Sequence, residues 1–176
     1  MDSLVESMGL LCLAIREGRG NQAGRTKLQK MIYFADRYLG WDVGDYKLHY
    51  YGPYSQNVAA TLQTTIGELV DETVPEIGPY GYELKPEGTV FLTEFVDNVC
   101  DEAKTQQTSE LFAELSQWSR DELELAATLD YVSKNTPGIT KENLIEKVST
   151  IKENFSPDTI KNAYELWSTW KTEHHF

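Results

Sequence analysis

Side chains that could carry out acid–base, nucleophilic or metal chemistry are few in this sequence and are spread along it. Histidine occurs at His49, His174 and His175, and cysteine at Cys12 and Cys100. Metal ligands and nucleophile–base pairs must converge, and motifs such as Cys-x-x-Cys, His-Glu-x-x-His and Gly-x-Ser-x-Gly bring them together at fixed spacings. None of these motifs occurs, so we expect no metal site, no cofactor and no catalytic residue.

Two segments instead have the composition of a binding surface. In the first, Arg25 to Phe34, helical spacing places basic side chains along one face of a helix. In the second, His49 to Ser55, three tyrosines surround a Gly-Pro dipeptide. The candidate contact residues are Arg25, Lys27, Lys30, Arg37, His49, Tyr51 and Tyr54. Tyrosine is favoured in interface hot spots. The alternative for both segments is structural, namely ion-paired helix surface and an aromatic cluster in the core.

Charge argues against a general affinity for nucleic acid. The formal net charge is −12, and it is unevenly distributed. The first 60 residues carry seven basic and six acidic side chains, whereas the remaining 116 carry nine and 22. An acidic chain repels nucleic acid at long range, so phosphate contacts would need a local basic patch. The acidic remainder is either a solubilising surface or a docking face for a basic partner.

Composition favours a cytoplasmic globular protein. The chain has 176 residues, of which 40% are hydrophobic and 11% aromatic, enough to bury a core in one domain. No segment approaches the run of about 20 apolar residues that spans a membrane, and no signal peptide is visible. Cys12 and Cys100 lie in apolar segments, which favours buried and reduced thiols.

The elements that must position the candidate residues follow from periodicity and turn signals. Apolar spacing predicts helices over 3–17, 25–39 and 55–70, and alternation predicts a strand over 46–51 that stops at Gly52-Pro53. A β-hairpin is expected from Tyr82–Leu84 and Thr89–Leu92, joined by a turn at 85–88.

The second half of the chain reads as helical. Ser119 followed by Glu122 is a capping-box pattern, and Ser156 followed by Pro157 marks another helix start. The expected helices are 93–105, 109–118, 120–134, 141–153 and 157–172. The sequence therefore predicts one mostly helical α+β domain, with a winged-helix-like head over 1–92 and helices over 93–176 packed on it.

The motifs also carry a family resemblance. Arg25-Thr26-Lys27-Leu28-Gln29-Lys30 with Ile32-Tyr33-Phe34, followed by Tyr51-Gly52-Pro53-Tyr54-Ser55, resembles the uncharacterised YwgA-like proteins of prokaryotes. More distantly, residues 25–70 are similar to the Panacea domain of SocA-like bacterial antitoxins. The near resemblance implies no known activity. The distant one implies binding to a toxin protein, or a role as regulator or adaptor, without catalytic residues.

We therefore expect a non-catalytic regulatory or antitoxin-like protein-binding module. The first alternative is a winged-helix DNA-binding transcriptional regulator that reads bases with the helix over 55–70. The second is an enzyme on a small molecule, which would need a pocket holding carboxylates or His49. A homodimer is a further expectation if Trp118, Trp167 or Trp170 is exposed.

Overall fold

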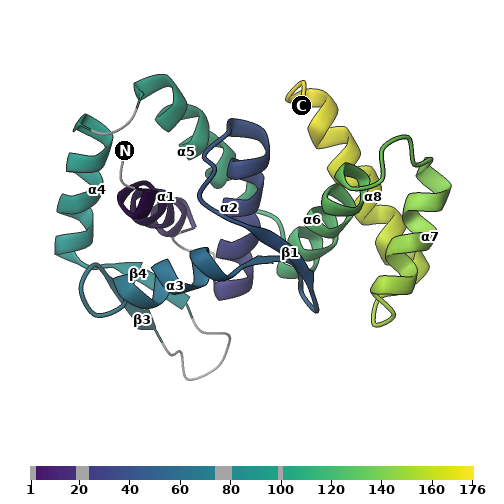
Figure 1. Cartoon of the computed structure of the whole chain (residues 1–176), viewed down its shortest axis with the longest axis horizontal. Coiled ribbons are helices and arrows are strands. Elements are labelled where there is room, and N and C mark those ends of the chain that lie inside the picture. The colour runs from purple at the N-terminus through teal and green to yellow at the C-terminus, as the bar shows by residue number, and fades with distance from the viewer. Residues whose placement is uncertain (1–2, 19–23, 74–80, 99–100) are drawn as a thin grey trace.

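The computed structural model describes residues 3–18, 24–73, 81–98 and 101–176 (Figure 1). Across these residues the fold is mostly helical with two small antiparallel hairpins, which confirms the predicted α+β class. No helix in these ranges is long and apolar enough to cross a bilayer. In chain order, the elements are α1 (Ser3–Glu17), α2 (Arg25–Leu39), β1 (Tyr46–His49), β2 (Gly52–Ser55), α3 (Gln56–Thr65), β3 (Val70–Thr73), β4 (Gly81–Leu84), α4 (Pro86–Asn98), α5 (Glu102–Ser116), α6 (Arg120–Lys134), α7 (Lys141–Ile151) and α8 (Pro157–Glu173).

Helix α1 lies at the centre of one end of the molecule. Helices α2, α3, α4 and α5 and strand β4 all contact it, and Figure 1 shows it nearly end-on among them. Every residue from Leu10 to Ile15 is buried. A helix that is apolar around its whole circumference is stable only inside a core, so the other elements assemble around α1.

Helix α2 connects the two ends of the molecule. It packs on α1 and α5, and also on α6 and β2. All residues from Leu28 to Ala35 are buried, which includes the polar Gln29 and Lys30. The helix ends as predicted at Leu39, because Gly40 adopts a left-handed conformation with φ of 63°.

Helices α6, α7 and α8 form the other end (Figure 1). The Ser119 side chain accepts a hydrogen bond from the Glu122 amide, and the Glu122 carboxylate accepts one from the Ser119 amide. This capping box fixes the start of α6, and Ser156 caps α8 with Pro157 in the first turn. The starts of all three helices match the sequence prediction.

The first hairpin pairs β1 with β2 in antiparallel register, from Tyr46 opposite Ser55 to His49 opposite Gly52. The prediction of a strand through residue 51 that stops at Gly52-Pro53 was therefore wrong, because the chain turns at Tyr50 and Tyr51. Gly52 begins β2 with φ of 86°. A Cβ there would lie 2.8 Å from Oγ1 of Thr128, so glycine allows β2 to approach α6.

The second hairpin joins β3 to β4, so the predicted pairing of 82–84 with 89–92 was also wrong. Residues 89–92 belong to α4, which starts at Pro86. Proline is well tolerated in the first turn of a helix. Leu92 and Phe95 are buried one helical turn apart. A helix satisfies this spacing and a strand does not.

Several predicted boundaries shift as a consequence. The expected helix over 55–70 ends at Thr65, and those over 93–105 and 109–118 are replaced by α4 and α5. The boundary expected between residues 92 and 93 falls inside α4. Helix α3 is nevertheless followed by a hairpin, β3–β4, as the winged-helix-like outline requires.

Candidate functional site

The described residues bring together no obvious catalytic or metal-binding group. No cluster of three His, Cys, Asp or Glu side chains suited to a metal occurs among them. Cys12 is buried, and burial raises the pKa of its thiol to about 12, whereas Cys100 lies outside the described residues. His49 is exposed on β1, and His174 pairs with Glu114 at 2.8 Å.

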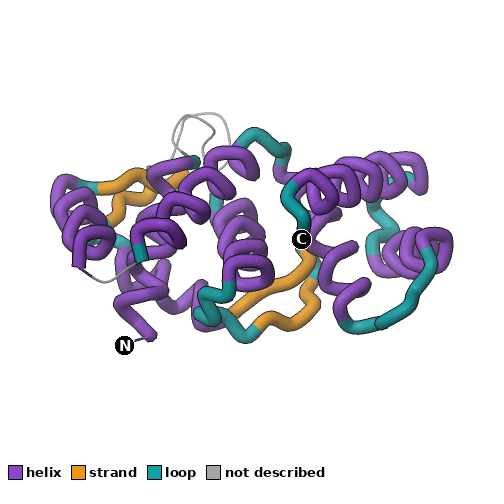
Figure 2. The backbone as a smooth tube through the Cα atoms, turned by 90° about the horizontal axis from the view of Figure 1, so that it is seen from above, coloured by secondary structure: helices purple, strands orange, loops and turns teal. Residues whose placement is uncertain are grey.

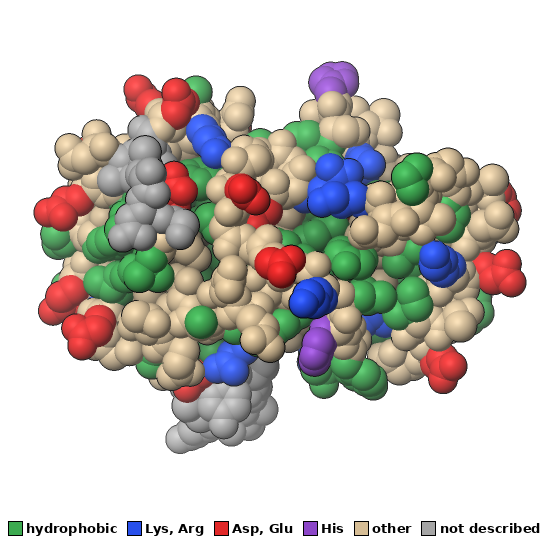
Figure 3. All heavy atoms as spheres, in the orientation of Figure 1, with side chains coloured by type: hydrophobic (Ala, Val, Ile, Leu, Met, Phe, Trp, Pro, Cys, Tyr) green, Lys and Arg blue, Asp and Glu red, His purple; other side chains and the backbone are tan. Residues whose placement is uncertain are grey.

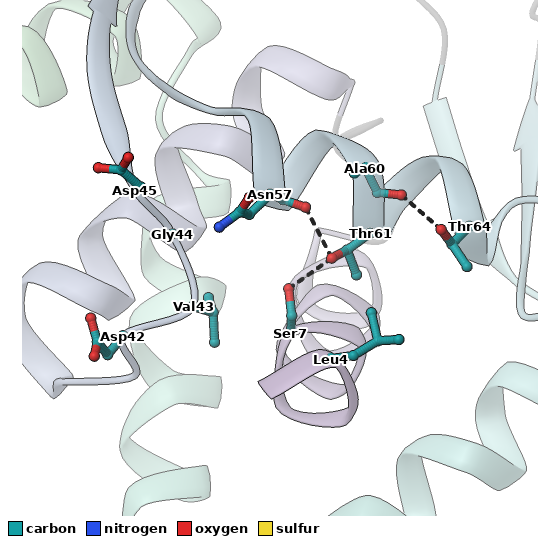
Figure 4. Close-up of a pocket in the computed structure, with 10 residues that line it drawn as sticks. All are labelled: Leu4, Ser7, Asp42, Val43, Gly44, Asp45, Asn57, Ala60, Thr61 and Thr64. Atoms are coloured by element: carbon teal, nitrogen blue, oxygen red, sulfur yellow. Dashed lines mark hydrogen bonds between the residues drawn. The ribbon is translucent and has the colours of Figure 1, made fainter. Parts of the chain in front are cut away.

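A hollow of about 530 Å³ lies between α1, α3 and the loop from α2 to β1 (Figure 4). Oγ of Ser7 lies 3.0 Å from Oγ1 of Thr61, which in turn donates to the Asn57 carbonyl. The carboxylates of Asp42 and Asp45 point away from these side chains in Figure 4. Among the described residues that line the hollow there is no Lys, Arg or His. It therefore offers polar surface without a nucleophile–base pair.

The four candidate basic residues of α2 do not form one surface. We call them the basic stripe: Arg25, Lys27, Lys30 and Arg37. Lys30 is 1% exposed, and its Nζ donates to the Pro53 carbonyl at 2.7 Å. Helical spacing placed this lysine on a polar face, but β2 and α6 pack on that face. The expectation that Lys30 is a surface contact residue is therefore corrected.

The other members of the stripe have separate environments. Nζ of Lys27 donates to the Ser116 carbonyl at 2.9 Å, and burial lowers its pKa. Nε of Arg37 lies 3.2 Å from Oδ2 of Asp130, and the guanidinium stands over the ring of Tyr38. Lys27 and Arg37 thus make structural contacts within the chain.

Arg25 is exposed and lies near Tyr82 of β4 and Tyr54 of β2. The hydroxyl of Tyr82 raises the pKa of its guanidinium, and Tyr54 contributes in the same direction. The half-buried Tyr54 also packs against His49, with ring centroids 5.3 Å apart. Three of the seven candidate residues, Arg25, His49 and Tyr54, therefore lie around the outer face of the β1–β2 hairpin.

The tyrosines of β1 and of the turn that follows it are divided between the core and the surface. Tyr46 packs inward against Tyr33, with ring centroids 5.0 Å apart. Tyr50 and Tyr51, which we call the tyrosine turn, are 68% and 47% exposed. Their rings are packed edge to face, with centroids 4.9 Å apart. Figure 3 shows hydrophobic side chains gathered around the free end of this hairpin, next to a histidine.

Arg120 extends the tyrosine turn onto α6. Its guanidinium carbon lies 5.0 Å from the centroid of the Tyr51 ring. This is within the range of a cation–π contact, which restrains both side chains. Sequence reasoning missed Arg120, because the contact depends on how α6 packs beside the hairpin.

Buried polar groups hold the backbone beneath the tyrosine turn. Nζ of Lys152 donates to the Tyr50 carbonyl and lies 2.6 Å from Oε1 of Glu124. The amide and carbonyl of Ser55 each bond the Gln29 side chain at 3.0 Å. With the Lys30 contact to Pro53, both sides of the turn are fixed from inside the protein.

Sequence reasoning also missed Lys152 and Glu124. Their side chains are 1% and 3% exposed. The available signal was a charged residue inside the apolar run Leu123-Glu124-Leu125-Ala126-Ala127. A charge in such a run requires a buried partner, although the sequence does not identify it.

The buried lysines interact electrostatically. Burial lowers the pKa of Lys30 to about 7, while Glu124 raises it and Lys152 lowers it further. Two ammonium groups beside one carboxylate would leave an uncompensated buried charge. Loss of the Lys30 proton leaves the Lys152–Glu124 pair balanced, and the neutral amine still donates to Pro53.

The tryptophans expected to support a homodimer are not on the surface. Trp118, Trp167 and Trp170 are 8%, 4% and 2% exposed. Trp118 and Trp170 pack against each other and against Phe34. These rings therefore form the core between α2, α6 and α8.

Comparison with known proteins identifies a relative that is similar over most of the chain. No family model matches the chain. The chain is 33% identical over 137 residues to the uncharacterized protein YwgA of Bacillus subtilis strain 168, and the match covers 76% of each chain. The chain therefore belongs to the YwgA-like family of uncharacterised proteins.

Proposed function

We propose that this chain is a non-catalytic, cytoplasmic protein-binding module with a regulatory or antitoxin-like role. The contact surface is the tyrosine turn, together with Arg120 and the neighbouring His49. One observation carries the proposal: two adjacent exposed tyrosines are mounted on a turn whose backbone is fixed by buried lysines.

The energetic argument concerns preorganisation. Association costs side-chain and loop entropy, and a surface already held in one conformation loses less of it. Tyrosine and arginine supply large contact areas and are enriched among residues that dominate binding. A turn that served only to connect two strands would need neither exposed aromatics nor buried charges beneath it.

The competing functions have weaker support. Lys27, Lys30 and Arg37 are occupied by contacts within the chain, so they form no basic stripe for DNA phosphates. Helix α3 contains no Lys or Arg. The hollow beside it holds no nucleophile–base pair, which leaves the enzyme hypothesis without a reaction centre in the described residues.

Affinity capture from native lysate, with and without nuclease, tests the proposal. We expect one protein to be captured in a fixed ratio to the bait and to remain after nuclease treatment. A partner that disappears with nuclease would support the DNA-binding alternative. Binding of a small molecule without any protein partner would contradict the proposal.

A further inference from the structure

The β1–β2 hairpin has one covered edge and one free edge. Strand β2 lies against α2 and α6, where Gln29 bonds both backbone polar groups of Ser55 and Lys30 bonds the Pro53 carbonyl. Strand β1 is on the outside of the hairpin (Figure 2). The residues Lys47, Leu48 and His49 are all exposed.

The register shows which groups of β1 face outward. Antiparallel pairs alternate between those that exchange hydrogen bonds and those whose N–H and C=O groups point away from each other. Because Ser55 directs both groups to Gln29, its pair with Tyr46 is of the second kind. Two residues further along, Leu48 has the same orientation. Its N–H and C=O therefore point away from β2.

Leu48 consequently presents an unused donor and acceptor. Within the described part of the chain, its N–H and C=O have no hydrogen-bond partner, whereas the Tyr46 carbonyl receives the Tyr131 hydroxyl at 3.4 Å. Unpaired strand edges are sites where another extended segment can pair. Here the edge is only a few residues long and begins next to the tyrosine turn.

We propose that an extended segment of the partner protein pairs with the β1 edge at Leu48. This inference rests on the proposed function and specifies how the partner binds. Strand addition gains affinity from main-chain hydrogen bonds and specificity from alternate side chains. The tyrosine turn would contact the same partner at the end of the added strand.

The charges around the edge define the chemistry of that segment. Lys47 and His49 project from the outer face of the hairpin, the face that also carries Tyr54 and lies near Arg25. The described acidic group nearest in sequence is Asp45, just before β1. An added strand with acidic residues at alternate positions would therefore meet opposite charge.

A second copy of this chain fits the edge poorly. Antiparallel pairing centred on Leu48 would place Lys47 of one copy opposite His49 of the other. That pairing places no acidic side chain opposite Lys47, so two copies would lack the charge complementarity that an acidic strand supplies. The net charge of −12 adds repulsion between copies.

The substitution Leu48→Pro tests the pairing directly. Proline removes the outward N–H and is tolerated on an edge strand, and it leaves the hydrogen bonds to β2 intact. Leu48→Ala is the matched control, because it shortens the side chain and keeps the N–H. Both variants should retain the wild-type circular dichroism spectrum and a cooperative thermal transition.

The probe is a phage library of random dodecapeptides selected on the wild-type protein. We expect enriched peptides with acidic residues at every second position, binding to Leu48→Ala but at least about tenfold weaker to Leu48→Pro. No enrichment, or equal binding to both variants, would overturn the strand-pairing inference. A captured lysate protein that needs the tyrosine turn but binds Leu48→Pro normally would overturn it too, while leaving the proposed function intact.

Discussion

The ammonium group of Lys152 lies 2.6 Å from Oε1 of Glu124, and the same group donates to the carbonyl of Tyr50. One buried ion pair, between α6 and the residue that follows α7, thus holds a surface turn from below. The arrangement joins the interior of the helical end to the exposed rings of the tyrosine turn. Stability and binding should therefore respond differently to changes beneath the turn and on it.

Removing one partner of the buried ion pair should be costly. Lys152→Met leaves the Glu124 carboxylate without its cation and the Tyr50 carbonyl without this donor, so we expect a loss of about 3–5 kcal/mol. The double variant Lys152→Met with Glu124→Leu should lose less than the sum of the single variants, by about 1 kcal/mol or more. Urea unfolding measures the free energy of unfolding of both single variants and of the double variant.

The exposed pair Lys141 and Glu165 provides the control for this cycle. Its nitrogen and oxygen are 2.5 Å apart, but the side chains are 40% and 54% exposed. Water screens such pairs, so Lys141→Met should change stability little. Additive losses at Lys152 and Glu124 would show that the buried pair is not coupled.

Lys30 should make the protein more stable as pH rises from about 7 to 9. Burial lowers its pKa from 10.5 to about 7, so in this range the unfolded chain binds a proton that the folded chain lacks. The free energy of unfolding then increases with pH, by roughly 2 kcal/mol over the range. Chemical unfolding at a series of pH values measures the slope.

The variant Lys30→Met isolates that slope. It should reduce the rise between pH 7 and 9, because methionine does not titrate. Above pH 9 a different trend is expected from Cys12, whose pKa burial raises from 9.0 to about 12. There the unfolded thiol ionises first, so Cys12 contributes a decrease in stability, which opposes the rise from Lys30 until the unfolded lysine titrates near pH 10.5. An equal rise in wild type and Lys30→Met would refute the assignment.

Asp36 should act in the opposite direction at lower pH. Burial raises the pKa of its carboxyl to about 6, although the amides of Val43 and Gly44 donate to it and lower the value. Between about pH 4 and 6 the folded chain holds a proton that the unfolded chain has lost. This group therefore contributes a decrease in stability of up to about 2 kcal/mol as pH rises.

The test is the difference between wild type and Asp36→Asn across this range. Other carboxyl groups titrate in both proteins, so their contributions cancel in the difference. The destabilisation of Asp36→Asn relative to wild type should shrink as pH rises from 4 to 6. A difference that is constant with pH would contradict the raised pKa.

Duplex DNA should not bind appreciably, even at about 50 mM salt, where phosphate contacts are strong. Three members of the predicted basic stripe make contacts within the chain, and the net charge is −12. A fluorescence anisotropy titration with a labelled random-sequence duplex measures the affinity of the protein for DNA. Binding that falls steeply with salt, and that Lys47→Glu weakens, would instead support a DNA-bound regulator.

Local signals determined much of the fold in advance. Ser119 with Glu122 located the start of α6, and Gly40 located the end of α2, because both features act within one helical turn. The run Thr89-Val90-Phe91-Leu92 was misassigned as a strand. Its β-branched and aromatic residues favour a strand locally, but burial of Leu92 and Phe95 on the same helical face decided the structure.

The candidate site was only half predictable. Tyr51 was among the predicted contact residues but Tyr50 was not, because both were expected in a strand that continued through residue 51 rather than in an exposed turn. The burial of Lys30 was not predicted, because its partner carbonyl is on β2 and its other neighbours are on α6 and at the end of α7. Contacts over such sequence separations leave no periodic signal along the chain.

The most direct test of the account compares partner binding and stability in one double variant. Tyr50→Ala with Tyr51→Ala removes the exposed rings. The control is Val90→Ala, which shortens a side chain on α4 that is 58% exposed. We expect the double variant to lose about 30-fold or more in affinity for the captured protein, with stability within about 1 kcal/mol of wild type. Val90→Ala should bind normally. Unchanged affinity of the double variant, or its unfolding, would contradict a contact role for the tyrosine turn.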